Sequence, residues 1–231
     1  NTMKNPLLSI IIPVYNVEKY LRASLDSIFI QDTADCEVLL INDGSKDGSL
    51  SILREYERKY QNVRVIDKVN EGVSTTRNRG IDECRGEYFY FMDADDILHP
   101  QLLSLLRKEI LEKYPDIVVW DFTTFYTNPK FVLIPSEIKT EDVQNRHQEA
   151  FNYLMANGSA VSLCSKAIRR SRVGEIIRLD PTMTYGEDMF FSWKAILVAD
   201  SIRYIRCPLY YYRQSGRGAT NHFHPNLYEH Y

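Results

Sequence analysis

Three carboxylates stand within four positions, directly after an apolar segment of the chain. The run Tyr88-Phe89-Tyr90-Phe91-Met92 is aromatic and apolar throughout, and Asp93-Ala94-Asp95-Asp96 follows it at once. Such a run is typical of a strand that is buried on both faces. Because carboxylates are costly to bury, we expect these three to lie at an open end of that strand. At the carboxyl end of a strand in an α/β sheet they are candidates for a divalent-cation site.

A structural alternative accounts for the same aspartates without any ligand. Asp96 would cap a helix that begins near Pro100, and Asp93 would close a turn. Acidic residues are common where a strand leads into a helix. The three aspartates alone therefore leave both interpretations open.

The composition is that of an ordinary globular protein and excludes several classes. Of 231 residues, 44% are hydrophobic and 26% are charged, which suits one α/β domain with an additional lobe. The formal net charge of −3 gives no electrostatic reason to expect a nucleic-acid partner. The cysteines stand far apart without a C-x-x-C pair, so neither a zinc site nor a disulfide framework is indicated. They are Cys36, Cys84, Cys164 and Cys207.

No part of the chain has the pattern of a membrane span or a signal peptide. No apolar run approaches the about 20 residues that a bilayer requires. Because Asn1 and Thr2 precede Met3 and Tyr231 ends the chain without a terminating pattern, we expect a fragment of a longer protein. We expect a cytoplasmic location. Peripheral association with the inner face of the membrane, through a missing C-terminal segment, stays open.

Strands and helices alternate up to about residue 113. Their order predicts a mostly parallel central sheet with helices on both faces, in which the strand ends meet at one edge. Asp43, Arg77 and the 93–96 segment then gather around one cleft. The expected elements are a strand at 7–14, a helix capped by Asn16, a strand at 37–42, a helix at 49–60, a strand at 63–66, a helix that carries Arg77, and the acidic strand at 88–92.

The rhythm changes in the second half of the chain. The expected elements are strands within 116–131, a polar loop over 137–148 that enters a helix at 149–155, a strand at 162–170, an apolar helix after 185–188, and a last strand at 201–212. We expect a mobile closing loop after that strand, with Arg213 and Arg217 as phosphate contacts. His222 and His224 follow it, and the pattern does not separate surface histidines from groups that assist a diphosphate or a metal.

Two common phosphate-binding motifs are absent from the sequence. No G-x-G-x-x-G follows the first strand, and no G-x-x-x-x-G-K-[ST] is present. Phosphate binding would then depend on a metal ion and on cationic side chains. Mg²⁺ and Mn²⁺ favour a few carboxylates together with phosphate oxygens, and a nearby arginine complements a diphosphate.

Six segments share their order and spacing with one known family. They are Ser9-Ile10-Ile11-Ile12-Pro13-Val14-Tyr15-Asn16, Asn42-Asp43-Gly44-Ser45-Lys46-Asp47-Gly48-Ser49, Asn70-Glu71-Gly72-Val73-Ser74-Thr75-Thr76-Arg77-Asn78-Arg79-Gly80, Phe91-Met92-Asp93-Ala94-Asp95-Asp96, Tyr185-Gly186-Glu187-Asp188 and Tyr211-Tyr212-Arg213-Gln214-Ser215. Together they resemble the family 2 glycosyltransferases, bacterial-type inverting enzymes with a GT-A fold. The resemblance covers roughly residues 7–215. It implies a nucleotide-sugar-binding half at 1–113 and an acceptor-side half of the same domain at 114–231.

The resemblance also implies ligands and roles. The donor would be a nucleoside-diphosphate sugar, usually of UDP, the cofactor Mn²⁺ or Mg²⁺, and the acceptor a saccharide or a lipid-linked hydroxyl in polysaccharide or glycolipid synthesis. In family terms Asp95 would be the principal metal ligand, with Asp93 beside it, and Asp188 would be the catalytic base. The nucleotide would contact Pro13, Val14, Tyr15, Asp43, Arg77, Asp93, Ala94 and Arg213.

Each role has a structural alternative. Asp43 would be a turn-forming residue. Arg77 would be an exposed helix residue paired with Glu71. Glu187 and Asp188 would form a negative first turn that suits the helix dipole. At the level of the whole chain, the alternatives are a non-catalytic nucleotide-sugar-binding module and a sugar nucleotidyltransferase, although the latter would need a Gly-rich basic loop after the first strand.

Overall fold

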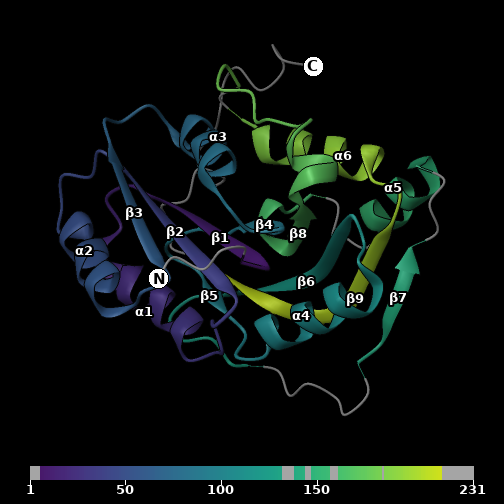
Figure 1. The fold of residues 1–231 in the computed structure, drawn as a ribbon, viewed down its shortest axis with the longest axis horizontal. Coiled ribbons are helices and arrows are strands. Elements are labelled where there is room, and N and C mark those ends of the chain that lie inside the picture. Colours follow the sequence, from purple (N-terminus) through teal and green to yellow (C-terminus); the bar gives the residue numbers. More distant parts are fainter. Residues whose placement is uncertain (1–5, 132–137, 144–146, 157–160, 184, 215–231) are drawn as a thin grey trace.

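A single mixed sheet runs through the protein, with helices on both of its faces (Figure 1). The computed structural model describes residues 6–131, 138–143, 147–156, 161–183 and 185–214. The strand order is β3-β2-β1-β4-β8-β6-β9-β5, and β7 pairs with β9 beside this path. Within the described residues, no helix has both the length and the apolar character needed to cross a membrane.

The first four long strands are parallel, as the alternating pattern predicts. β1 pairs with β2 and β4, and β2 pairs with β3, all in parallel. Their carboxyl ends therefore lie at one edge of the sheet. The elements of this half are β1 (Leu8–Val14), α1 (Glu18–Phe29), β2 (Cys36–Asp43), α2 (Ser49–Lys59), β3 (Val63–Lys68), α3 (Val73–Glu83) and β4 (Tyr88–Phe91).

The two faces of the sheet bury two separate cores. Ile10 and Ile12 of β1 belong to the core under α1, α2 and α4, whereas Ile11 belongs to the core under α3, α5 and α6. This alternation is why the strands read as continuous apolar runs. Gly80 of helix α3 lies against the sheet, where an added Cβ would lie 2.3 Å from Cγ2 of Ile11. A larger residue there would push α3, and the Arg77 that it carries, away from the sheet.

The second half of the chain continues the same sheet. β8 pairs antiparallel with β4 and β6, and β6 pairs in parallel with β9. Helix α6 covers the face opposite α4 (Figure 1). The elements are β5 (Ile97–Leu98), α4 (Leu102–Lys113), β6 (Ile117–Phe125), β7 (Thr140–Val143), α5 (His147–Ala156), β8 (Lys166–Arg169), α6 (Glu187–Val198) and β9 (Ile202–Arg213).

Two expectations for the second half need correction, and one strand, β5, was not predicted. β7 lies within the segment expected to be a polar loop, because it is an edge strand that pairs with β9 and needs few apolar residues. β5 has two residues, too few for any periodicity. The strand expected at 162–170 is shortened to β8, since residues 163–165 form a 3₁₀ turn and residues 170–174 a π turn.

Two predicted helix caps are wrong. Asn16 has a φ of 50°, and α1 begins only after Val17. The side-chain oxygen of Asn16 instead accepts a 2.7 Å hydrogen bond from the Lys46 backbone N–H, which joins the loops after β1 and β2. Asp96 does not cap α4, which begins after Gln101 without a side-chain cap. Its carboxylate is fully buried and bonds to β9, as described below.

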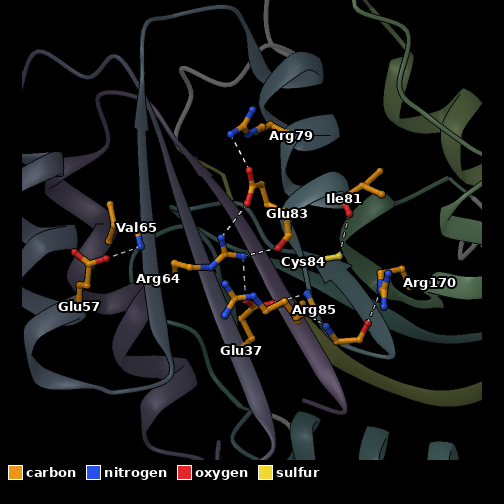
Figure 2. Close-up of polar contacts among 12 residues, drawn as sticks. Glu37, Glu57, Arg64, Val65, Arg79, Ile81, Glu83, Cys84, Arg85 and Arg170 are labelled. Atoms are coloured by element: carbon orange, nitrogen blue, oxygen red, sulfur yellow. Dashed lines mark hydrogen bonds and ion pairs between the residues drawn. The ribbon is translucent and has the colours of Figure 1, made fainter. Parts of the chain in front are cut away.

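A buried carboxylate ties together the amino ends of the central strands (Figure 2). Glu37 at the start of β2 accepts hydrogen bonds from the Ser9 hydroxyl at 2.6 Å, the Arg85 backbone N–H at 2.9 Å and the Arg64 guanidinium at 3.1 Å. The Ser9 hydroxyl in turn accepts the Gly86 N–H at 2.8 Å. The network links β1, β2 and β3 to the turn before β4, at the opposite end of the strands from the aspartates.

We expect Glu37→Ala to destabilise the protein by about 2 kcal/mol, because it leaves the buried Ser9 hydroxyl without its acceptor and removes one acceptor each from the Arg85 N–H and from Arg64, which keeps its ion pair with Glu83. The measurement is urea unfolding at neutral pH. Glu55→Ala is the matched control, since Glu55 makes its ion pair with Arg22 at the surface, and we expect no measurable change. Equal stability of the two variants would contradict the structural role of Glu37.

Candidate functional site

Two clefts open next to each other at the carboxyl ends of the parallel strands. The first has a volume of about 1290 Å³ and lies between the loops after β1 and β2, the start of α3 and the 93–95 segment. The second has a volume of about 640 Å³ and lies between β6, β9 and the turn before α6. Val73 and Asp93 line both clefts. A ligand in one cleft would therefore lie next to a ligand in the other.

The structure brings most of the predicted donor-site residues together in the first cleft. Arg77 and Asp188 line the second cleft instead, and Arg213 is absent from the described lining of both. The predicted residues that line the first cleft are Pro13, Val14, Tyr15, Asp43, Asp93, Ala94 and Asp95.

Asp96 is the most deeply buried of the three aspartates that follow β4. It has 0% exposure, accepts a 2.5 Å hydrogen bond from the Tyr210 hydroxyl, and accepts another at 2.7 Å from the Arg213 backbone N–H. Burial, and then the charges of Asp93 and Asp95, raise the pKa of Asp96 to about 8. Both of its oxygens are occupied by β9. Asp96 therefore anchors the end of β4 to the last strand.

Asp93 is neutralised by an arginine. Its carboxylate accepts a 2.8 Å bond from the Arg77 guanidinium, and its backbone N–H donates to the Tyr210 hydroxyl at 3.1 Å. Tyr210 thus contacts both Asp93 and Asp96. Sequence reasoning missed Tyr210, because a tyrosine in a tyrosine-rich strand gives no signal for which ring meets the aspartates.

Asp95 has no such compensation. In the part of the chain that the structure describes, its carboxylate makes no ion pair and no hydrogen bond to another residue, although it lines the first cleft. Burial, and then the charge of Asp93, raise the pKa of Asp95 to about 6. An uncompensated carboxylate in a cleft gains more than a paired one from a bound cation.

Arg77 is buried in α3 and joins the two clefts. Its guanidinium contacts Asp93 at 2.8 Å and Asp188 at 2.5 Å. Burial alone would lower the pKa of Arg77, but the carboxylates of Asp188 and Asp93 raise it above its ordinary value, so the group stays charged. The alternative of an exposed helix arginine paired with Glu71 is wrong, since Arg77 is 3% exposed and Glu71 pairs with Lys68.

Asp188 lies in the first turn of α6, at the other end of Arg77. Gly186, with a φ of 78°, precedes the helix in a conformation that other residues rarely adopt, and so directs this turn toward α3. Burial raises the pKa of Asp188 to about 6, although the charge of Arg77 opposes this shift. A carboxylate with this pKa is largely ionised at pH 7 and still accepts a proton readily.

Asp43 holds the loop in front of the first cleft. Its carboxylate accepts backbone N–H bonds from Glu71 at 2.9 Å and Gly72 at 3.0 Å, and it pairs with Lys68. Gly72 has a φ of 89°, which lets the chain turn sharply into α3. Asp43 is therefore more than a local turn residue, because it joins β2 to a loop 28 residues later.

We expected Arg213 to lie in a mobile closing loop, but it is the last residue of β9. The side chain is buried, and its Nε donates a 2.7 Å hydrogen bond to the Asp95 carbonyl oxygen. Its guanidinium carbon lies 4.6 Å from the ring centre of Tyr20 and 4.5 Å from the ring centre of Phe125. These contacts hold the 95–96 turn in place. A role in phosphate binding stays a prediction. Arg217, His222 and His224 lie outside the described residues.

The donor set suits a cation that shares its ligands with a bound molecule. Among the described residues, no three His, Cys, Asp or Glu side chains are placed to hold a metal ion together. Mg²⁺ and Mn²⁺, however, commonly use one or two carboxylates plus phosphate oxygens and water. Asp95, which lacks a partner, and Asp93 beside it fit that requirement, whereas Asp96 does not.

Comparison with known proteins identifies similar sequences and folds. A model of the family named Glycosyl transferase family 2 matches residues 9–176. The protein named uncharacterized glycosyltransferase EpsJ, from Bacillus subtilis, is 30% identical over 97% of this chain and 66% of its own length. This chain thus spans slightly less than two thirds of that relative.

Two solved structures share the fold. S. aureus TarS in complex with UDP-GlcNAc has a TM-score of 0.78 at 23% identity, over 94% of this chain and 61% of TarS. The mannosyltransferase PcManGT from Pyrobaculum calidifontis, in complex with GDP-Man and Mn²⁺, has a TM-score of 0.63 at 17% identity, over 93% of this chain and 58% of its own. These likenesses confirm the predicted GT-A-like α/β fold.

We expect Asp95→Asn to stabilise the cation-free protein at pH 7.5 by about 2 kcal/mol and to change little at pH 4. The folded protein raises the pKa of Asp95 to about 6, from 3.8. The ionised form therefore costs stability above the folded pKa, and this cost disappears as the pH falls toward the unfolded value. The measurement is urea unfolding with a chelator at both pH values.

Glu112→Gln is the matched control, because Glu112 is exposed on α4 and far from the clefts in sequence. We expect it to be neutral at both pH values. A pH-independent effect of Asp95→Asn, or destabilisation at pH 7.5, would contradict the claim that the ionised Asp95 carboxylate costs stability in the cation-free protein.

Proposed function

The chain belongs to glycosyl transferase family 2, and on this premise we propose that it is a metal-dependent inverting glycosyltransferase. It moves a sugar from a nucleoside-diphosphate donor, with UDP as the nucleotide, to a hydroxyl group of a saccharide or lipid-linked acceptor in polysaccharide or glycolipid synthesis. The observation that carries the proposal is the placement of two carboxylates in two adjoining clefts: Asp95, which has no ion pair, lines the first cleft, and Asp188, which is paired with Arg77, lines the second.

The first cleft takes the donor. The loop held by Asp43, together with Pro13, Val14 and Tyr15, surrounds the space for the nucleoside, and Asp95 lies on the same cleft for the diphosphate. The complex of TarS with UDP-GlcNAc supports a UDP-sugar as donor for this fold. The first cleft also has about twice the volume of the second, as a nucleotide with its sugar requires.

A divalent cation would be held by Asp95, with Asp93 beside it. Bound there, it supplies positive charge that offsets the negative charge developing on the leaving diphosphate. PcManGT binds Mn²⁺ together with its nucleotide sugar, which supports Mn²⁺ as the cofactor. The ion pair between Arg77 and Asp93 reduces the repulsion between Asp93 and the neighbouring carboxylates at this edge of the sheet.

The second cleft takes the acceptor, with Asp188 as the catalytic base. The acceptor hydroxyl oxygen forms a bond to the anomeric carbon while the bond from that carbon to the diphosphate oxygen breaks. The hydroxyl proton passes to the Asp188 carboxylate, and the electron pair leaves with the nucleoside diphosphate. Attack from the face opposite the leaving group inverts the anomeric carbon. Arg77 holds Asp188 at 2.5 Å and so orients it toward the boundary of the clefts.

The two alternatives explain less of the geometry. A sugar nucleotidyltransferase would need a Gly-rich basic loop after β1, where this chain has Pro13-Val14-Tyr15-Asn16. A non-catalytic binding module gives no reason for a second cleft with a carboxylate whose pKa is raised to about 6. The transferase accounts for both clefts and for the arginine between them.

We expect Asp188→Asn to reduce the rate of sugar transfer by at least about 10²-fold and to leave UDP binding within about twofold, since general-base assistance is typically worth 10²–10⁴-fold. The measurements are a transfer assay and a calorimetric titration with UDP and Mn²⁺. Glu175→Gln is the control, because Glu175 is an exposed acid outside both clefts, and its transfer rate should equal that of the parent. Unchanged transfer by Asp188→Asn would remove Asp188 from the mechanism.

We expect Asp95→Ala to weaken UDP binding in the presence of Mn²⁺ about 10²-fold or more, and to weaken uridine binding less than about threefold. The reason is that the cation contacts the diphosphate and not the nucleoside. Calorimetry with both ligands checks it. Equal weakening of UDP and uridine would argue against a cation at Asp95.

A further inference from the structure

The second cleft has an aromatic floor made by two neighbouring strands. Phe122 and Thr124 alternate along β6, and the strand register pairs them with Tyr210 and Tyr212 of β9. Because side chains alternate along a strand, these four lie on one face of the sheet, and all four line the cleft. Phe122 is 42% exposed, which is unusual for a phenylalanine on a central pair of strands. β6 and β9 lie side by side beneath α6 (Figure 1).

This aromatic floor begins at the reacting groups. The Tyr210 hydroxyl accepts the Asp93 N–H at 3.1 Å, so the hydroxyl end of this buried side chain lies beside the boundary of the two clefts. Tyr185, 36% exposed, adds a further aromatic side chain from the turn before α6. A molecule that lies on the floor therefore has one end close to Asp188, which follows that turn.

The described lining of the second cleft is acidic. It carries the carboxylates of Asp93, Glu187 and Asp188, and its cation is Arg77. Arg77 is buried and already pairs with two of these carboxylates, so its charge is balanced by them and not by a ligand in the cleft. Burial raises the pKa of the Cys164 thiol well above its ordinary value, which keeps that group neutral. An anion in this cleft would meet a surplus of negative charge.

We propose that the second cleft selects a neutral sugar as the acceptor terminus, packed with the C–H face of its ring on Phe122 and Tyr212, and rejects sugars that carry a carboxylate or phosphate beside the reacting hydroxyl. The inference rests on the proposed function, because it assigns the acceptor to this cleft. Aromatic faces attract the weakly positive C–H groups of a sugar ring. Polar groups at the acidic end then accept hydrogen bonds from its hydroxyls. Phe122 provides the affinity, and Glu187 provides much of the exclusion of anions.

The test compares neutral and anionic sugars of the same shape. The neutral probes are the methyl glycosides of glucose, galactose and N-acetylglucosamine, and the anionic probes are the methyl glycosides of glucuronic and galacturonic acid. Binding to the protein with UDP and Mn²⁺ is followed by saturation-transfer NMR titration at low salt. We expect at least one neutral glycoside to bind at least tenfold more tightly than its uronate. Uronates that bind as tightly as the neutral sugars, or no binding by any neutral sugar, would overturn the inference.

Two variants separate the contribution of the aromatic floor to sugar binding from the contribution of the negative charge. We expect Phe122→Ala to weaken the neutral glycoside about 3- to 10-fold, as the loss of one aromatic contact predicts, whereas Tyr126→Ala should have no effect. Tyr126 is the matched control because it follows β6 and is 76% exposed outside the described lining of the cleft. We expect Glu187→Gln to tighten the uronates at least threefold and to leave the neutral glycosides within twofold. A Phe122→Ala protein with parental affinity, or unchanged discrimination in Glu187→Gln, would contradict the proposal.

UDP titration of every variant keeps this inference separate from the proposed function. A parent protein that fails to bind UDP with Mn²⁺ would refute the proposed transferase itself. A parent that binds UDP and prefers uronates would refute only the acceptor inference. Parental UDP affinity in Phe122→Ala also shows that the variant is folded.

Discussion

A buried strand that runs directly into three carboxylates sets the constraint on which the rest of this structure depends. Each charge at the end of β4 must be compensated or must cost stability. Asp96 accepts hydrogen bonds from Tyr210 and Arg213, more than 110 residues later in the chain, and its pKa of about 8 leaves it largely protonated and uncharged at pH 7. Asp93 is compensated by Arg77. The carboxylate of Asp95 has no ion pair or hydrogen bond to another described residue, and burial and the charge of Asp93 raise its pKa to about 6, although the charge of Arg213 opposes this shift. The fold thus supports two of the carboxylates and leaves the third to a ligand.

The same arrangement explains why the two halves of the chain form one site. Arg77 comes from the parallel half and contacts Asp188 from the other half, while Tyr210 and Arg213 of β9 hold the turn that carries Asp95. A donor in the first cleft and an acceptor in the second would therefore approach each other across Asp93 and Arg77. Since a buried guanidinium does not lose its proton, Arg77 keeps its positive charge over the pH range in which Asp188 titrates.

The sequence predicted the parallel half well because its strands are continuous apolar runs that alternate with amphipathic helices. The rule that parallel strand ends meet at one edge predicted that Asp43, Arg77 and the 93–96 segment gather around one cleft; Asp43, Asp93 and Asp95 do line the first cleft, whereas Arg77 lines the second. The resemblance, rather than periodicity, singled out the segment that carries Asp188. The partners were harder to predict, since the sequence does not show which face of α3 is buried or which tyrosine of β9 meets Asp96. β5 and β7 escaped detection because a two-residue strand and a polar edge strand give no apolar pattern.

The central claim is that Asp95 is left uncompensated so that a cation can join it to the diphosphate of the donor. The most direct measurement is a crystal structure of the protein soaked with UDP and Mn²⁺, with an anomalous difference map collected near the manganese edge. The account predicts a manganese peak within coordination distance of an Asp95 carboxylate oxygen and of a diphosphate oxygen in the first cleft. A nucleotide bound in another place, or one bound in this cleft with neither manganese nor a phosphate oxygen near Asp95, would contradict it.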